Sequence, residues 1–423
     1  MGSVSYWQAE AAGGDAGDVP TRHHTALEGD ARAEVAIVGG GITGTSTALW
    51  LAQAGVPVAV LEGRTIAAGA SGRNGGFLLA GTAESYATAI ARYGRERARR
   101  IWDFSTRNQR LAASLAEELA ALGWATGFRR TGSLRIAATD AEYADLMASD
   151  TLQRGDGWDA ELLPRDRLPA RIQAHYSGAA YYPGDGEIQP ARFVTGLARL
   201  SEGAGAAIYE ASPVTAIEPD GEGVRITTAG GGTLRAGAAL LATNAWLPEL
   251  LAPLGAGAVA LADAIAPTRG QMLVTAPVAD RLFDCPCYAD EGYQYWRQLD
   301  DGRLAVGGWR NTSFATENTS DETPGGAVQS SLDAFVHEML GLAGLPIERR
   351  WAGIMAFSRD GLPYVGRLPG QLNVYVAGGY TGHGNASAIL AARTIADLIL
   401  GQPTPDADLF APARIFAGKQ AAQ

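Results

Sequence analysis

Lysine is almost absent from this sequence, which contains a single one, Lys419, near its end. A Walker A loop requires a lysine beside the nucleotide phosphates, and Schiff-base or pyridoxal chemistry requires a lysine amine. The body of the chain offers no such side chain. Both kinds of chemistry are therefore excluded there.

Cysteine is nearly as scarce, with only Cys285 and Cys287 on either side of a proline. Two cysteines in 423 residues do not make a disulfide framework, so we expect two unpaired thiols in a reducing cytoplasm. No run approaches the roughly 20 apolar residues that span a bilayer. The N-terminus has no basic start followed by an apolar core, so we expect no secretory signal and no membrane partner.

Positive charge is also in deficit, because the formal net charge is −11 and the pI is near 5.0. An acidic surface repels phosphate backbones, so we expect no nucleic-acid partner. The five histidines lack metal-ligand spacing, so we expect no metal site; they are His23, His24, His175, His337 and His383. The length exceeds the roughly 250–300 residues at which one core stops growing, which predicts two domains or two interleaved ones.

Glycine, by contrast, is abundant and clustered, with 55 residues in all. An apolar run over 35–38 leads into a G-x-G-x-x-G motif at 39–44, a predicted helix over 42–54 and a second apolar run over 58–61. Gly39 permits a tight turn, Gly41 lets the backbone approach a pyrophosphate, and Gly44 lets the helix pack on the sheet. Glu62 then stands where a carboxylate accepts hydrogen bonds from ribose hydroxyls. This pattern is typical of a dinucleotide-binding βαβ unit.

A second glycine cluster lies more than 300 residues later, where a predicted strand over 374–377 runs into a helix start at 378–384. An extended cofactor could use both helix N-termini, one for its pyrophosphate and one near an electron-accepting ring. Between the clusters we predict helices over 84–122, 140–153, 193–203 and 329–342, with a last one over 386–400. Strands are predicted over 134–137, 213–217, 224–228 and 239–243, and 265–310 is mainly β. Residues 1–31 are expected to form an extended arm and 311–326 an exposed loop.

With these motifs the sequence resembles the D-amino-acid-oxidase superfamily of FAD-dependent oxidoreductases, and within it the gamma-glutamylputrescine oxidoreductase group. The matching segments are 5–7, 39–44, Ser-Gly-Arg-Asn-Gly-Gly at 71–76, Pro190, 213–217, 241–246, 351–353, 360–363 and 380–384. The resemblance implies an α/β fold (α+β overall) in which a Rossmann-like FAD-binding domain is interleaved with a mostly antiparallel β-sheet substrate domain. We assign 1–31 to the arm, 32–83, 180–246 and 345–405 to the FAD domain, 84–179 and 247–344 to the substrate domain, and 406–423 to a tail.

The resemblance also implies which residues hold FAD. They are Gly39, Gly41, Ile42, Thr43, Gly44, Glu62, Gly63, Ser71, Arg73, Asn74, Gly75, Gly76, Val214, Thr243, Asn244, Trp246, Gly379, Tyr380, Thr381, Gly382, His383 and Gly384. Relatives tether FAD through a cysteine near 353–354 or a histidine after the ribose acid. This chain has neither, so we expect non-covalent FAD.

The departures from the family pattern bear on the substrate. Relatives that clamp a carboxylate carry cationic side chains at three positions that are here Met355, Ala386 and Leu79, and an oxygen-activating lysine where Ala305 stands. An unpaired buried carboxylate costs several kcal/mol. We therefore expect a small-molecule amine without a clamped α-carboxylate, such as a polyamine or a gamma-glutamyl amine, oxidised to an imine that water hydrolyses. The electron acceptor would be oxygen, giving peroxide, or another compound.

Aromatic side chains suit such a substrate. The expected substrate-binding residues are Phe77, Tyr293, Tyr295, Trp309, Met355, Phe357 and Tyr380, and His383, Tyr295 and Trp309 are the candidate catalytic groups beside a flavin that does the chemistry. Glu291 or Asp290 could pair with a distal ammonium. Two alternatives stay open: an amino-acid or imino-acid oxidase whose clamp is Arg297 or Arg310, and a flavin-binding subunit without turnover.

Overall fold

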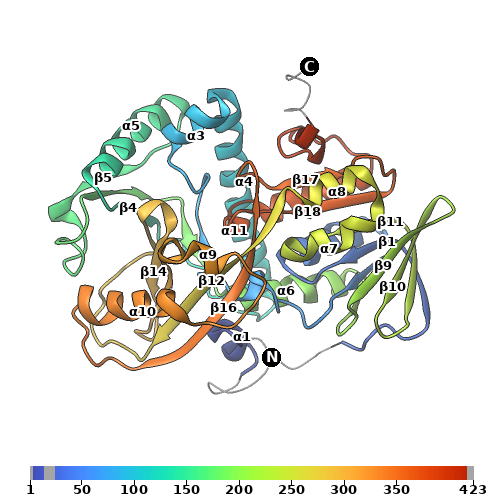
Figure 1. The fold of residues 1–423 in the computed structure, drawn as a ribbon, viewed down its shortest axis with the longest axis horizontal. Coiled ribbons are helices and arrows are strands. Elements are labelled where there is room, and N and C mark those ends of the chain that lie inside the picture. Colours follow the sequence, from blue (N-terminus) through green and yellow to red (C-terminus); the bar gives the residue numbers. More distant parts are fainter. Residues whose placement is uncertain (1–2, 14–23, 417–423) are drawn as a thin grey trace.

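Two eight-stranded sheets organise the residues that this computed structural model describes, namely 3–13 and 24–416 (Figure 1). The first sheet has the strand order β17-β18-β11-β1-β2-β8, with a β9–β10 hairpin on β11. Its strands are β1 (Asp30–Val38), β2 (Val58–Leu61), β8 (Ala207–Tyr209), β9 (Val214–Asp220), β10 (Gly223–Thr228), β11 (Thr233–Leu241), β17 (Tyr364–Arg367) and β18 (Val374–Gly378).

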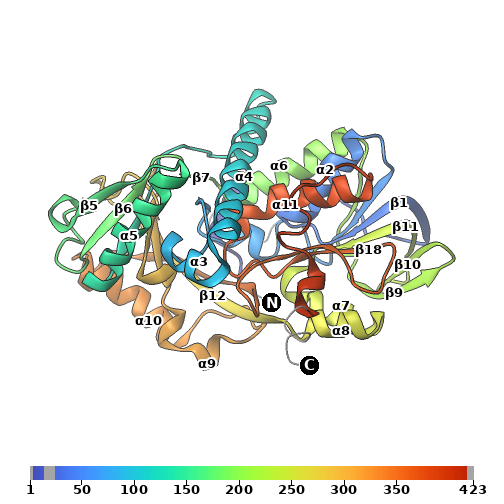
Figure 2. The same ribbon diagram turned by 90° about the horizontal axis from the view of Figure 1, so that it is seen from above.

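The centre of this sheet is parallel, because β1 pairs in parallel with both β2 and β11, and β18 continues the parallel order beside β11. One face is covered by α2 (Ile42–Gln53), α6 (Pro190–Gly203) and α11 (Gly384–Ile399), with the long α4 (Arg95–Ala121) against α11. On the opposite side lie α7 (Leu247–Leu251) and α8 (Ala256–Ala262) (Figure 2). Burial on both faces explains why the central strands are continuous apolar runs.

The second sheet has the strand order β16-β12-β15-β14-β13-β4-β6-β5 and is antiparallel apart from the β13–β4 pair. Its strands are β4 (Ser133–Ala137), β5 (Glu161–Pro164), β6 (Gly178–Tyr182), β12 (Ile265–Thr275), β13 (Cys287–Ala289), β14 (Gln294–Gln298), β15 (Leu304–Gly308) and β16 (Ile347–Ser358). The helices associated with this half are α3 (Tyr86–Tyr93), α5 (Asp140–Asp156), α9 (Phe314–Glu317) and α10 (Gly326–Ala334), the last extended by a π-helical turn over Phe335–Met339. A short pair, β3 (Phe77–Leu78) with β7 (Gly186–Glu187), completes the strands of the described residues.

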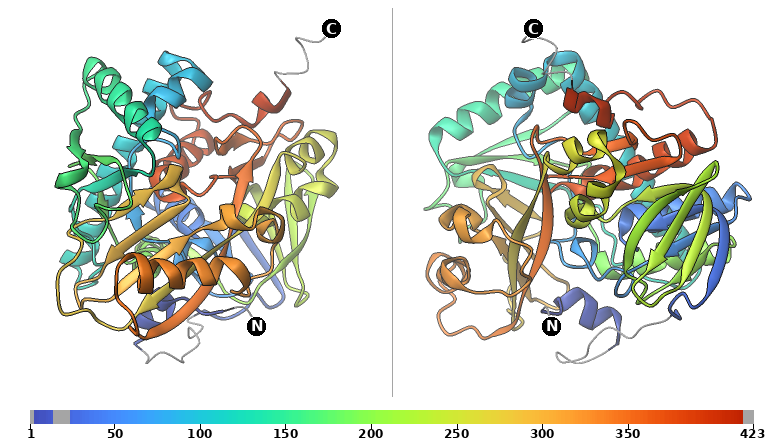
Figure 3. Two further views of the ribbon diagram at one scale, coloured as in Figure 1. Left: turned by 60° about the vertical axis from the view of Figure 1, so that its left-hand side comes forward. Right: turned by 45° about the vertical axis from the view of Figure 1, so that its right-hand side comes forward.

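The period of two along β14 determines which side chains of the second sheet meet the helices. Trp296 is fully buried and packs against Phe335 of the helical layer, at a ring-centroid distance of 4.7 Å. Its neighbours Tyr295 and Arg297 point to the other face, where the sheet meets the first half of the molecule. The long strands β12 and β16 run along this border (Figure 3).

The expected interleaved α/β fold is confirmed, and most predicted helices and strands lie where the pattern put them. Two strands bear on the expected domain boundaries. Strand β16 falls in the range 345–405 expected for the FAD domain, yet it pairs with β12 along its whole length. We therefore propose that the last FAD-domain segment starts after Ser358. Strand β6 likewise crosses the expected boundary at residue 180.

Two segments predicted as irregular are ordered by specific contacts. The N-terminal arm contains α1 (Tyr6–Ala11), which begins with a capping box between Ser5 and Gln8, and Trp7 is buried against Trp351. The polar loop over 311–326 is not simply exposed, because Glu317 is buried against Arg269. Residues 1–2 and 14–23 of the arm and 417–423 of the tail lie outside the described residues.

No helix in residues 3–13 and 24–416 is long and apolar enough to cross a membrane. Both cysteines are free and buried, and burial raises the pKa of the Cys285 thiol to about 12. These thiols are therefore protonated core side chains near neutral pH.

Candidate functional site

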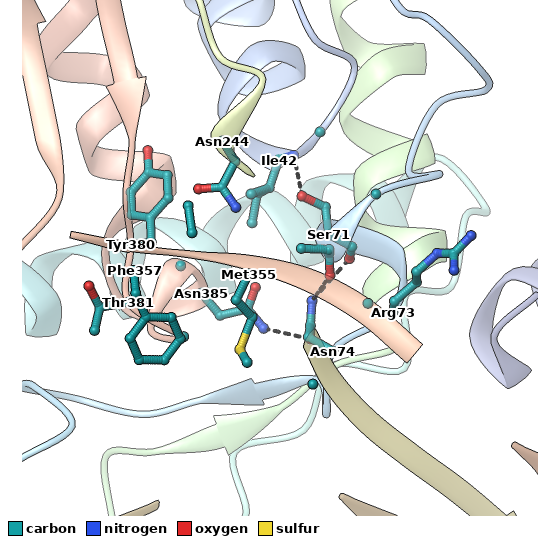
Figure 4. A pocket seen from close by; sticks show the side chains of 18 of the residues that line it. Ile42, Ser71, Arg73, Asn74, Asn244, Met355, Phe357, Tyr380, Thr381 and Asn385 are labelled. Carbon is teal, nitrogen blue, oxygen red and sulfur yellow. Dashed lines mark hydrogen bonds between the residues drawn. The ribbon is translucent and has the colours of Figure 1, made fainter. Parts of the chain in front are cut away.

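A cavity of about 820 Å³ lies between the two sheets, and residues of both glycine clusters line it (Figure 4). At one end it reaches Glu62, Pro213 and Val214, and at the other it is bordered by aromatic side chains of the second sheet. The cavity is therefore long and joins the carboxyl edge of a parallel sheet to the face of an antiparallel one. Ligands of open α/β sheets bind at such edges.

The first glycine cluster leaves no room for side chains at the start of α2. Gly39 has φ +114°, and an added Cβ would lie 2.8 Å from the carbonyl oxygen of Ala242. At Gly41 an added Cβ would lie 2.9 Å from Oγ of Ser71, and that oxygen accepts the amide hydrogen of Ile42 at 3.0 Å. The N-cap of α2 is Gly41, which has no side chain to cap the helix, and Gly41, Ile42 and Thr43 line the cavity, as an anion-binding turn requires.

Glu62 stands beside this turn at the end of β2. Its carboxylate accepts the amide hydrogens of Gly40 at 2.8 Å and Arg64 at 2.7 Å. Burial raises the pKa of this carboxyl, and the two amide hydrogen bonds oppose that shift. The two hydrogen bonds thus hold the carboxylate beside the helix start, where the dinucleotide-binding pattern predicts a ribose.

The segment after β2 is fixed from several sides. Arg73 donates from Nε to the carbonyl of Ala68 and from Nη1 to that of Ala352, both at 2.8 Å. Burial lowers the pKa of Arg73 to about 10, and the negative charge of Glu322 partly opposes this shift. Asn74 accepts the Asn385 amide at 3.0 Å through Oδ1, which joins this segment to α11. Figure 4 shows these side chains around the cavity.

The second glycine cluster brings α11 to the same cavity. His383 is the N-cap residue and makes no capping hydrogen bond, so the first amides of α11 are not satisfied by a cap. The hydroxyl of Tyr380 lies 2.9 Å from Oγ1 of Thr43, which links the two helix starts. Both helix N-termini therefore border one cavity, where the two-cluster hypothesis expects a single extended cofactor.

Most of the sequence-predicted residues line the cavity. Those expected to hold the cofactor and found there are Gly39, Gly41, Ile42, Thr43, Glu62, Gly63, Ser71, Arg73, Asn74, Gly75, Val214, Thr243, Asn244, Trp246, Tyr380, Thr381, Gly382, His383 and Gly384. Three expected glycines lie behind the wall, namely Gly44, Gly76 and Gly379. They shape the backbone: an added Cβ at Gly44 would overlap the carbonyl oxygen of Gly39, and one at Gly76 that of Ile188.

At the other end of the cavity the predicted substrate residues form an aromatic chamber. Its predicted members are Phe77, Tyr293, Tyr295, Met355, Phe357 and Tyr380. Phe77 and Tyr295 meet edge to face at 6.0 Å, and burial raises the pKa of Tyr295 to about 12. These phenol and phenyl rings offer apolar walls with few charges.

Trp309 does not line this chamber, although it was expected there. It has a left-handed backbone conformation, with φ 57° and ψ 16°, directly after β15. This turn sends its indole into the core, where it packs against Phe335 at 4.9 Å, and brings Arg310 to the cavity instead. The guanidinium of Arg310 lies over the rings of Phe357 and Tyr293, at 4.4 and 4.7 Å from their centroids.

Arg310 has no ion pair or side-chain hydrogen bond within residues 3–13 and 24–416. The other arginine considered as a clamp, Arg297, lies outside the cavity, over the ring of Trp7 and paired with Glu187 at 3.6 Å. The three positions at which relatives are expected to be cationic, Leu79, Met355 and Ala386, all line the cavity. These three side chains are uncharged, whereas the guanidinium of Arg310 lies directly against rings of the aromatic chamber.

His383 is held between Tyr288 and its own turn. Its Nε2 lies 3.2 Å from the Tyr288 hydroxyl, and its Nδ1 lies 3.4 Å from the carbonyl of Thr381. A carbonyl only accepts, so Nδ1 carries the proton and Nε2 accepts from Tyr288. Burial, helped by the charge of Arg135, lowers the pKa of His383 to about 4, so the imidazole is neutral near pH 7.

Several lining residues were not among those predicted from the sequence to form the site; they include Tyr288, Arg64, Pro213, Asn385 and Glu322. Arg64 and Asn385 directly adjoin the recognised motifs, so the motif boundaries could have been drawn wider. Tyr288 and Glu322 carry no local signal, because each reaches the cavity only through the arrangement of the second sheet.

The residues present fit the expected FAD. The turn at the start of α2 leaves space for a pyrophosphate, Glu62 is placed for a ribose, and α11 points its N-terminus at the aromatic end. Two lining polar atoms, Oγ1 of Thr243 and Oε1 of Glu322, are buried without a hydrogen-bond partner in the described part of the chain. Such atoms are expected where a polar ligand completes the site.

Comparison with known proteins agrees with this geometry. A family model described as FAD dependent oxidoreductase (DAO) matches residues 34–398. Glycine oxidase of Geobacillus kaustophilus is 30% identical over 375 residues, covering 87% of this chain and 93% of that protein. Gamma-glutamylputrescine oxidoreductase of Escherichia coli is 30% identical over 377 residues, covering 87% and 84%. The crystal structure of the Geobacillus glycine oxidase superposes with a TM-score of 0.77 at 27% identity, covering 90% of this chain and 98% of the other.

Proposed function

The chain belongs to the D-amino-acid-oxidase (DAO) family of FAD-dependent oxidoreductases, and on this premise we propose that it oxidises the C–N bond of an amine that has no clamped α-carboxylate. The family accounts for the cofactor, FAD, and for the type of bond that is oxidised. The identity of the amine is the part that we propose.

The observation that carries the proposal is the composition of the chamber beside the predicted flavin position. Its walls are the rings of Tyr293, Tyr295 and Phe357 together with the thioether of Met355. All three residues at the positions where the family resemblance implies cationic side chains, Met355, Leu79 and Ala386, line the cavity and are uncharged. A carboxylate there would lose its water and gain no partner from these three residues.

FAD, when bound, supplies the hydride acceptor, and the protein supplies binding and orientation. A neutral amine is the form that gives up a hydride from its adjacent carbon. Arg310 carries a positive charge beside the chamber and so disfavours an ammonium at that point, and His383 is neutral and adds no negative charge to offset this effect. Tyr288, which donates to His383, keeps Nε2 of the imidazole occupied as an acceptor.

The outer rim of the cavity favours a substrate with a second polar end. Glu291 is exposed and lines the cavity, so it is available to a distal ammonium of a polyamine-like substrate. The similarity to gamma-glutamylputrescine oxidoreductase supports the same class of long amine substrate. The electron acceptor would be oxygen or a second compound.

A second candidate function rests on Arg310 alone. A guanidinium stacked on two rings and free of an ion pair in the described residues can bind a carboxylate with two hydrogen bonds. The substrate would then be an amino acid or imino acid, as the name of the Geobacillus relative suggests.

The test is anaerobic bleaching of the flavin by a substrate panel, with putrescine and gamma-glutamylputrescine on one side and glycine, sarcosine and D-alanine on the other. We expect the first pair to bleach the flavin. Bleaching by the amino acids alone would replace the proposal with the second candidate. Peroxide production and dye reduction, measured in parallel, would identify the acceptor.

A further inference from the structure

Residues 318–325, here called the strap, connect α9 with α10 and belong to the half of the molecule built on the second sheet. Four consecutive strap residues, Ser320, Asp321, Glu322 and Thr323, line the cavity. The strap therefore borders the cofactor site although it comes from the opposite half of the molecule. Nothing in the function proposed above uses it.

Both ends of the strap are fixed to strand β12. Arg269 pairs with Glu317 at 2.9 Å, just before the strap, and donates to the carbonyl of Thr323 at 2.9 Å. Gln271 exchanges hydrogen bonds with the backbone of Gly325, accepting its amide at 2.9 Å and donating to its carbonyl at 3.2 Å. The base of the strap is thus held by buried side chains of its own half.

The tip of the strap is held by the other half. The carboxylate of Glu322 pairs through Oε2 with Nη1 of Arg64 at 2.8 Å and with Nη2 of Arg73 at 3.4 Å. The backbone carbonyl of Glu322 accepts a hydrogen bond from Oγ of Ser3 at 3.0 Å. Arg64 and Arg73 lie in the segment after β2 and both line the cavity, so Glu322 closes a contact across the cofactor site.

The second oxygen of this carboxylate is unused. Oε1 of Glu322 is buried and has no hydrogen-bond partner within the described residues, while Glu322 itself lines the cavity. A carboxylate oxygen only accepts hydrogen bonds, so the missing partner is a donor. FAD offers such donors as the hydroxyl groups of its ribose and ribityl chain, whereas its pyrophosphate offers only acceptors.

We propose that the strap closes over bound FAD and that Glu322 is its latch, joined to Arg64 and Arg73 on one side and accepting a hydrogen bond from a cofactor hydroxyl on the other. FAD leaves only when this contact opens. Retention of FAD is thereby assigned to a contact between the two halves of the chain. The inference concerns the cofactor and does not depend on which amine is the substrate.

The experiment measures the rate at which the FAD-loaded protein releases FAD, followed as the rise of free flavin fluorescence after strong dilution. Glu322→Gln keeps the shape of the side chain and removes its charge. We expect release to become about tenfold faster, which corresponds to ~1.4 kcal/mol of lost retention. In the unsubstituted protein, release should also accelerate with added salt, because Arg64 is partly exposed, and Glu322→Gln should lose most of that dependence.

The matched control is Asp333→Asn, which removes the charge from a similar pair, Asp333 with Arg350 at 2.7 Å, on α10 and outside the cavity. Its release rate should equal that of the unsubstituted protein. An unchanged rate in Glu322→Gln would overturn the proposal. A slower rate would also overturn it, since it would mean that Glu322 competes with the pyrophosphate for the two arginines. The salt dependence of the unsubstituted protein tests the latch even if the variant folds poorly.

Discussion

The hydroxyl of Tyr288 lies 3.2 Å from Nε2 of His383 and joins strand β13 of the second sheet to the start of α11 on the first. The two rings stand edge to face at 5.6 Å. Through this contact an imidazole at the predicted flavin end of the cavity is kept buried and oriented. Its protonation state follows from that burial.

The first prediction concerns the pH dependence of flavin reduction. Because burial lowers the pKa of His383 to about 4, the imidazole stays neutral from about pH 5 upward. We expect the stopped-flow reduction rate to show no step near pH 6.5 and to follow only the deprotonation of the substrate amine. Tyr288→Phe should lower the rate while keeping the shape of the profile. A step between pH 6 and 7 that His383→Asn removes would contradict this assignment.

The second prediction concerns Arg310. The substitution Arg310→Gln removes the positive charge that lies over the rings of Tyr293 and Phe357. Hydrogen bonds to charged groups are worth ~1.5–3 kcal/mol, so kcat/KM for any carboxylate-bearing substrate should fall by about 10- to 150-fold. For simple amines it should stay the same or rise. The control Arg350→Gln, on an ion pair outside the cavity, should change neither. Equal losses for both substrate classes would show that Arg310 has only a structural role.

The third prediction concerns the tight turn before α2. Gly44→Ala places a Cβ on the backbone carbonyl of Gly39, which cannot swing away as a side chain could, with the side chain of Ile37 also close by. We expect loss of FAD binding and a lower unfolding temperature. Gly203→Ala, at the end of α6 with open space around it, is the matched control and should be neutral or slightly stabilising. Retention of FAD with unchanged affinity in Gly44→Ala would contradict the role of this turn.

The fourth prediction concerns Asp185, a buried carboxyl away from the cavity. It accepts hydrogen bonds from Ser133 and Gln109, both at 2.6 Å, and burial raises its pKa from 3.8 to about 6. The folded protein therefore holds this proton more tightly than the unfolded chain. The resulting stabilisation is present below about pH 4 and is lost as the pH rises through 6.

Comparison with Asp185→Asn isolates this contribution. The free energy of unfolding of the unsubstituted protein, relative to the variant, should fall by about 3 kcal/mol between pH 4 and pH 7. Urea unfolding at several pH values measures it. A difference that does not vary with pH would show that the pKa of Asp185 is not raised.

The fifth prediction is that FAD is bound without a covalent bond. Of the histidines and cysteines in the described residues, His383 alone lines the cavity, and it is already engaged with Tyr288 and the Thr381 carbonyl. Acid precipitation should give a colourless pellet and a yellow supernatant. A pellet that stays yellow would point to a link through His383, which His383→Asn would abolish.

The cofactor half of the site was predictable because the residues that form it lie in short, continuous stretches of sequence. Glycines at Gly39, Gly41 and Gly44 require particular backbone conformations over six residues, and the carboxylate of Glu62 follows one helix and one strand later. These are local properties of the chain. Their neighbours in the sequence are also their neighbours in the site, so pattern and structure agree.

The substrate half was predictable only as a set of aromatic residues. Trp309, directly after β15, has a left-handed backbone conformation, so its side chain lies in the core and Arg310 lines the cavity instead. The alternation of apolar and polar residues does not predict such a turn. The sequence named both arginines that could serve as a clamp. Tertiary packing determines which of the two reaches the cavity, because Arg297 instead stacks on Trp7 and pairs with Glu187.

What the sequence determined by itself is the family, the dinucleotide-binding turn and the absence of the usual cationic clamp residues. What only the tertiary structure decided is which side chains from the second sheet face the cavity and where the strap lies. Glu322 meets Arg64 across 258 positions of the chain. A contact of that kind depends on how two sheets pack together, and neither local conformation nor hydrophobic periodicity contains that information.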